Sequence, residues 1–139
     1  MAEAMSIAAY KATIREIETP RNIERRIFAR ITADLEAHAS AYDAAASNLD
    51  RLGILSGGLS AALNDNVMFW SALKHDLAEA GNQLPPDLRA NLISLALWVE
   101  RQTAVVLGGE AGVAALISTN RAIVAGLAGN APRPVGAEV

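Results

Sequence analysis

The segment of residues 84–101 sets the tightest limits on the fold of this chain. It contains the pair Pro85-Pro86, and proline suits the first turn of a helix because its missing N–H has no partner there anyway. Over residues 92–99 this helix is apolar on every side, and such a helix must be surrounded by other elements. We therefore predict that the helix Pro86–Leu107 is the centre of the fold.

The composition predicts one domain with a substantial core. The chain has 139 residues, of which 52% are hydrophobic, and this apolar content excludes a chain that is disordered throughout. The net charge of −3 gives no electrostatic reason to expect a nucleic acid as the main partner. The absence of cysteine excludes disulfides and thiol chemistry.

Helical periodicity recurs along the chain, whereas signals for strands are almost absent. We predict an all-α, single-domain bundle of about five helices over residues 1–128, followed by a disordered tail at 129–139. One long helix is expected to bend near the alanine-rich stretch, to stop at Gly53 and to precede a loop at 54–58. The predicted helices cover residues 4–17, 19–52, 59–81, 86–107 and 113–127.

No segment reaches the roughly 20 apolar residues that a membrane-spanning helix needs. The first ten residues carry an acid and no base, which is unlike a secretory signal. These two observations predict a cytoplasmic protein that makes no use of a membrane.

Catalytic and metal-binding motifs are absent from the sequence. His38 and His75 lie on separate predicted helices, and a catalytic zinc ion would want three protein ligands. The glycine-rich stretch at Ser56 lacks the following Lys-Ser/Thr of a phosphate-binding loop. We therefore expect no enzyme activity, no metal and no cofactor.

Four residues are candidates for contact with a partner: Arg25, Phe28, Phe69 and Asn120. Arg25 belongs to a run of arginines at helical spacing, which is either a solvated face or a patch for RNA or an acidic partner. In the Met68-Phe69-Trp70 triplet, three large side chains cannot share one helix face, so one of the first two faces a second helix or the surface. Asn120 interrupts an apolar stripe, where a buried amide either fixes helix packing or contacts a ligand.

Several of these residues also resemble, in order, those of the FlaF flagellar biosynthesis regulators of alphaproteobacteria. The match covers roughly residues 8–127. It rests on Ala9-Tyr10, on Thr19-Pro20-Arg21 with Arg25-Arg26-Ile27-Phe28, on Asn66 and Trp70, on Leu84-Pro85 with Leu88-Arg89, on the series Ile93-Ser94-Leu95-Ala96-Leu97-Trp98-Val99, and on Asn120-Arg121.

The resemblance implies a cytoplasmic protein that is needed for flagellin production and acts after transcription. It implies that the protein binds flagellin through the terminal helices of flagellin. It also implies FlbT as a second partner. Three hypotheses follow: a flagellin-binding secretion chaperone or adaptor, an RNA-binding regulator of flagellin messenger RNA that uses the arginine run, or an adaptor that acts only through FlbT.

Overall fold

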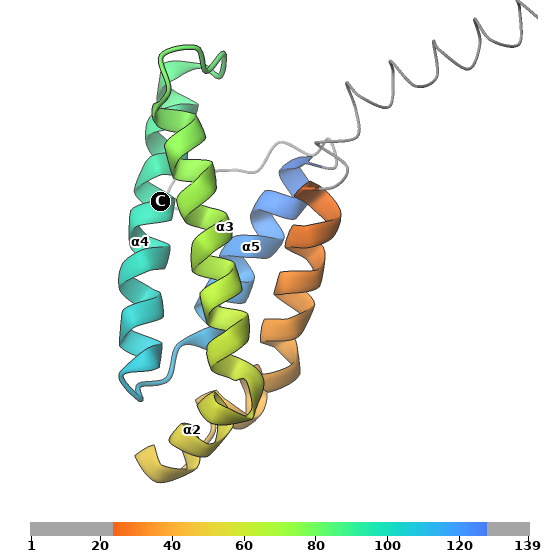
Figure 1. The fold of residues 1–139 in the computed structure, drawn as a ribbon, viewed down its shortest axis with the longest axis vertical. Helices are drawn as coiled ribbons and strands as arrows, with labels where there is room; N and C mark the ends of the chain where they lie inside the picture. The colour runs from red at the N-terminus through yellow and green to blue at the C-terminus, as the bar shows by residue number, and fades with distance from the viewer. Residues whose placement is uncertain (1–23, 128–139) are drawn as a thin grey trace, which may run out of the picture.

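The computed structural model describes residues 24–127, and all regular structure in that range is helical. The predicted all-α class is therefore confirmed (Figure 1). The predicted helix at 4–17 and the predicted tail at 129–139 lie outside the described residues. In chain order the elements are a helix of residues 24–43, α2 (Asn48–Ile54), the wide helical turn η1 (Leu55–Leu59), α3 (Ser60–Ala78), α4 (Pro86–Leu107) and α5 (Val113–Leu127).

The long helix predicted for residues 19–52 breaks where the bend was expected, because helix 24–43 ends just before Ala44. Ser47 then caps α2 by accepting a hydrogen bond from the backbone N–H of Asp50 at 3.2 Å. The short helix α2 lies across the end of the bundle (Figure 1).

The predicted stop at Gly53 and the predicted loop at 54–58 are wrong. Gly53 lies inside α2, and the chain continues through η1 into α3 with a sharp kink at Gly58. Gly58 has a φ of 129°, a region that side chains with a Cβ rarely adopt, and His38 packs within 3.1 Å of where that Cβ would lie. The sequence contains three glycines in this stretch, Gly53, Gly57 and Gly58. The local sequence does not show at which of them the helix bends, and the structure places the kink at Gly58.

The helix Pro86–Leu107 has the predicted bounds, with Pro86 in its first turn and Gly108 directly after it. Its position differs from the prediction that it is the centre of the fold. It buries one face, chiefly against α3, while Leu97 is 41% exposed and Leu107 is 46% exposed on its other side. The apolar pattern correctly indicated a strongly hydrophobic helix, but other helices cover only part of its surface.

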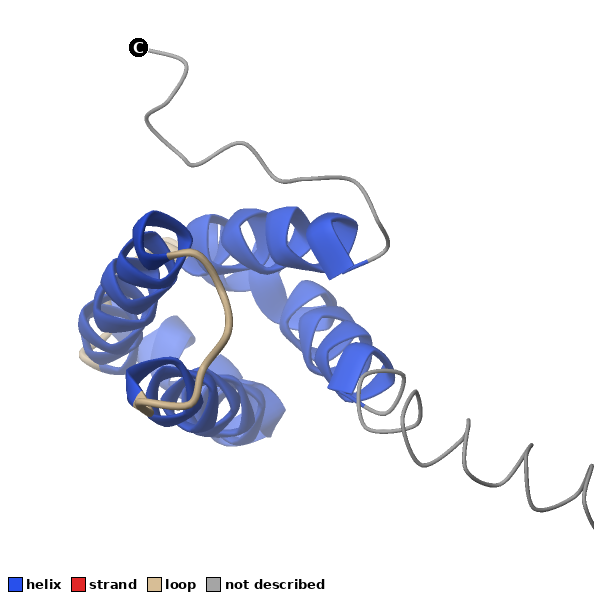
Figure 2. Cartoon of the chain, turned by 90° about the horizontal axis from the view of Figure 1, so that it is seen from above, coloured by secondary structure: helices blue, strands red, loops and turns tan. Residues whose placement is uncertain are grey.

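α3 lies between α4 and helix 24–43, and α5 lies across the bundle from it, so that these helices surround a shared interior (Figures 1 and 2). Trp70 on α3 is fully buried and contacts the ring of Phe28 from helix 24–43 edge-on, with the ring centroids 5.9 Å apart. On the opposite side, Lys74 forms an ion pair with Glu100 of α4. Side chains of α3 thus contact both neighbouring helices.

Candidate partner-binding groove

A groove runs between helix 24–43 and α3, and apolar side chains from both helices line it. Its volume is about 320 Å³. Two of its apolar residues remain accessible, since Ile27 is 40% exposed and Met68 is 62% exposed. We call it the partner groove, and it is lined by Ile27, Arg30, Ile31, Asp65, Met68 and Phe69.

A pair of stacked aromatic rings supports the floor of the partner groove. Phe69 is half-buried and stacks on the fully buried Phe28, with ring centroids 4.5 Å apart and planes 10° from parallel. Phe28 in turn contacts Trp70. The groove is thus the outer layer of the core, and its floor is held in place from below.

A buried polar network fixes the three helices that surround this aromatic cluster. The amide of Asn120 on α5 accepts a hydrogen bond from the indole Nε1–H of Trp70 at 2.9 Å. Its Nδ2 donates to Oδ1 of Asn66 at 2.8 Å and to the hydroxyl of Thr32 at 3.2 Å. One side chain therefore ties helix 24–43, α3 and α5 together at a single height, which sets their register.

The structure brings only part of the predicted contact set to the surface. Phe69 lies in the partner groove, and Arg25 is half-buried on helix 24–43, one turn before Phe28 and Ala29. Phe28 and Asn120 have no exposed surface. In this folded conformation neither can contact a partner, and Asn120 has the packing role that its place in an apolar stripe also suggested.

Sequence reasoning missed Ile27 and Asp65 as groove residues. Ile27 follows the apolar spacing of its helix, and that spacing alone does not show that it lies at the exposed edge of the buried stripe. The Met68-Phe69-Trp70 triplet indicated that Met68 or Phe69 faces a second helix or the surface, but helical geometry alone could not show which of the two it is. The distinguishing feature is the neighbouring helix, which covers Phe69 in part and leaves Met68 open.

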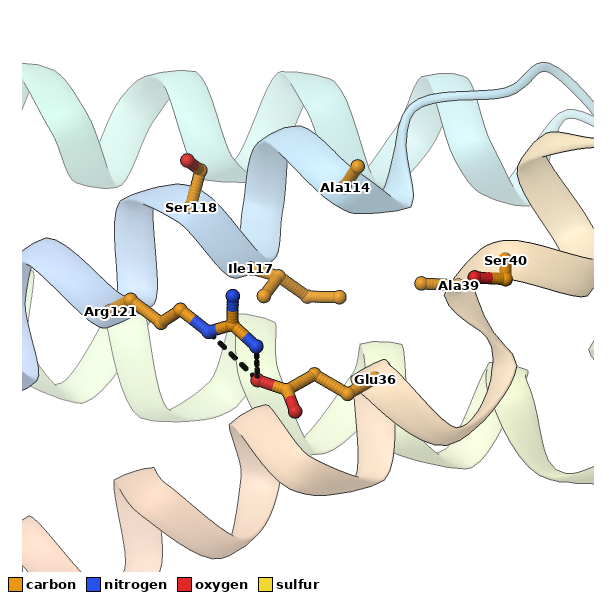
Figure 3. A pocket seen from close by; sticks show the side chains of 7 residues that line it. All are labelled: Glu36, Ala39, Ser40, Ala114, Ile117, Ser118 and Arg121. Carbon is orange, nitrogen blue, oxygen red and sulfur yellow. Dashed lines mark hydrogen bonds and ion pairs between the residues drawn. The ribbon is translucent and has the colours of Figure 1, made fainter.

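A second cleft, of about 360 Å³, separates helix 24–43 from α5 (Figure 3). Alanine and serine side chains from the two helices line it, with Ile117 between them. At one end Arg121 donates from Nε to Oε1 of Glu36 at 2.9 Å, so these two charges are already paired. Its small and polar lining offers little apolar surface to a partner, and we do not choose it as the functional site.

A third cleft, next to the kink, is lined partly by Asp34, His38, Gly58 and Asp65. Over residues 24–127, no three His, Cys, Asp or Glu side chains are grouped so that they could hold a metal ion. In the same range no helix has both the length and the apolarity to cross a membrane.

Asp43, the last residue of helix 24–43, caps α5 from a distant part of the chain. Its carboxylate accepts hydrogen bonds from the backbone N–H groups of Gly112 at 2.9 Å, Val113 at 3.0 Å and Ala114 at 3.0 Å. Burial by itself would raise the pKa of Asp43, but these three bonds and the charge of Arg51 outweigh it and lower the pKa below its ordinary value. Gly112 has no side chain that could accept these hydrogen bonds, and Asp43 accepts them instead.

We expect Asp43→Ala to lower the free energy of unfolding by about 1–2 kcal/mol at pH 7, the usual cost of a lost helix cap. Because the folded-state pKa is depressed, this contribution is present above the unfolded-state pKa near about 4 and is lost as the pH falls through the folded-state value. The difference between wild type and variant should therefore shrink in urea titrations repeated at successively lower pH. Asp65→Ala, at an exposed acid within α3, is the control and should change little. A difference for Asp43→Ala that stays constant down to the lowest pH would contradict the assignment.

Comparison with known proteins places the chain in a family. A family model described as "Flagellar protein FlaF" matches residues 6–127, which is most of the chain. Searches of curated proteins and of solved structures each find no match. The resemblance noted in the sequence is thereby confirmed: the chain belongs to the FlaF family and is a flagellar protein involved in flagellar biosynthesis.

Proposed function

We propose that this protein is a non-enzymatic cytoplasmic adaptor that binds unassembled flagellin and thereby controls flagellin synthesis or export after transcription. Membership of the FlaF family supports the flagellar context. The resemblance noted in the sequence directs attention to the terminal helices of flagellin, which are amphipathic and unpaired before assembly. FlbT is a candidate second partner of the same adaptor.

The observation that carries this proposal is the partner groove. An amphipathic helix binds a hydrophobic groove through anchors spaced three and four residues apart. Ile27 and Ile31 on one helix and Met68 on the other form such a groove, with Phe69 on its floor. The thioether of Met68 adapts its shape easily, which suits a surface that must accept a partner side chain.

Titration calorimetry with the full-length chain and monomeric flagellin tests the proposal. We expect a complex with a Kd below about 10 µM, which corresponds to a binding free energy of about −7 kcal/mol or better. Deleting the terminal helices of flagellin should abolish the heat signal. If no complex forms at concentrations of tens of micromolar, flagellin is not the partner and the proposal fails.

We expect Met68→Glu to weaken flagellin binding at least about tenfold, which corresponds to about 1.4 kcal/mol. The new carboxylate would have to be desolvated against the apolar stripe of the bound helix. Folding should be unaffected because Met68 is exposed. Leu49→Glu is the matched control, since Leu49 on α2 is 78% exposed and lies outside the groove; equal binding by the two variants would remove the groove from the proposal.

The RNA-binding alternative receives less support from the structure. Phe28 is the one aromatic residue within the arginine run of helix 24–43, and it is buried, so it offers no ring on which a base could stack. Binding of flagellin leader RNA that weakens steeply with salt, and that is lost in Arg25→Glu/Arg26→Glu, would reverse this preference.

A further inference from the structure

The partner groove carries one unpaired charge of each sign, one on each of its two helices. Arg30 projects from helix 24–43 and Asp65 from α3, and both side chains are exposed. The ion pairs within residues 24–127 are Lys74–Glu100 and Arg121–Glu36. In that range the side chains of Arg30 and Asp65 form no hydrogen bond or ion pair. Each charge is therefore available to a group on a bound partner.

The shape of the groove favours a helix as its occupant. Two neighbouring helices form its walls, and a third helix can pack its side chains into the depression between such walls. Within the described part of the chain there is no strand whose edge an extended peptide could join. Arg30 comes from one wall of the groove and Asp65 from the other, and each wall also carries apolar side chains. A helix that places its apolar stripe against Ile27 and Met68 would therefore turn one flank toward the wall with Arg30 and the other toward the wall with Asp65.

From this arrangement we infer that the groove selects one amphipathic helix whose apolar stripe has an acidic flank on one side and a basic flank on the other. The acidic flank lies along Arg30 and the basic flank along Asp65. Because turning a helix end to end in a groove exchanges its flanks, the two charges also determine the direction in which the helix lies. This inference deepens the proposed function, on which it rests for the choice of the groove as the binding site.

Three synthetic helical peptides with the same length and the same apolar stripe test the inference. One has an acidic and a basic flank, the second has two acidic flanks and the third has two basic flanks. Each is titrated at low salt into the full-length chain, and binding is followed by fluorescence anisotropy. We expect the peptide with opposite flanks to bind tightest, by about three- to tenfold, since each exposed pair contributes modestly.

Two variants of the chain should change this order in opposite directions. Arg30→Glu makes both sides of the groove acidic, so the peptide with two basic flanks should bind tightest. Asp65→Lys makes both sides basic, so the peptide with two acidic flanks should bind tightest. Asp50→Lys on α2 is the control for a general change in net charge and should leave the wild-type order intact, and raising the salt concentration should level all differences.

The inference is overturned if the order is the same in all four proteins, if no peptide binds, or if sedimentation shows that a second copy of the chain covers the groove and excludes the peptides. Failure of the proposed function gives a different pattern. If the peptides follow the expected order but flagellin does not bind, the groove selects helices by the charges on their flanks as inferred, and flagellin is the wrong partner. If flagellin binds and the peptides show no order, flagellin uses another surface.

Discussion

Replacing Asn120 with alanine should lower the free energy of unfolding by about 3–5 kcal/mol. The substitution leaves the indole N–H of Trp70 and the amide oxygen of Asn66 buried without their partner. Each orphaned buried group costs about 1–3 kcal/mol, and the cavity left by the missing amide adds to that loss. Urea denaturation followed by circular dichroism measures the change.

Ser118→Ala on the same helix is the matched control, because Ser118 is exposed and outside the buried network. It should change the free energy of unfolding by less than about 0.5 kcal/mol. A loss below about 1 kcal/mol for Asn120→Ala would show that the network contributes little and that apolar packing alone holds the three helices in register. A loss in the expected range would place Asn120 among the residues on which the fold depends most.

The role of Asn120 shows how far sequence reasoning reaches in this protein. A polar residue within an apolar stripe signals a buried amide that needs partners, and that part could be predicted. The partners could not, because Asn66 and Thr32 lie 54 and 88 residues away in the chain. Periodicity describes one helix at a time, whereas a hydrogen bond of this kind depends on how separate helices are placed.

The same limit explains the mixed outcome for α4. Its start at Pro86 and its end before Gly108 follow from local backbone chemistry, and both were predicted correctly. Its place in the bundle depends on which neighbouring helices are available, and these cover only one of its faces. The kink at Gly58 is a related case, because the residue that packs against it, His38, lies on another helix and is not adjacent in the sequence.

The partner groove was predictable only in outline. The Met68-Phe69-Trp70 triplet required that one of its first two side chains face outward or toward a second helix, and the structure confirms both parts of that statement. The opposing wall, with Ile27 and Arg30, could not be assigned to the same site, since nothing in the sequence states which helices are neighbours.

Phe28→Ala should lower the free energy of unfolding by about 3–5 kcal/mol, the usual cost of removing a fully buried phenylalanine. Phe28 has no exposed surface and contacts both Trp70 and Phe69, so its loss opens a cavity beneath the partner groove. Thermal and urea unfolding of the full-length chain measure the effect.

Phe69→Ala provides the comparison, because Phe69 is half-buried and contacts solvent at the groove. We expect it to cost about 1–2 kcal/mol, from the lost stack on Phe28 and part of the buried area. Flagellin binding should nevertheless fall in Phe69→Ala, because the floor of the groove is removed while the protein stays folded. Equal destabilisation by the two substitutions would mean that Phe69 belongs to the core as fully as Phe28 does, and the groove would then have to bind its partner through Ile27 and Met68 alone.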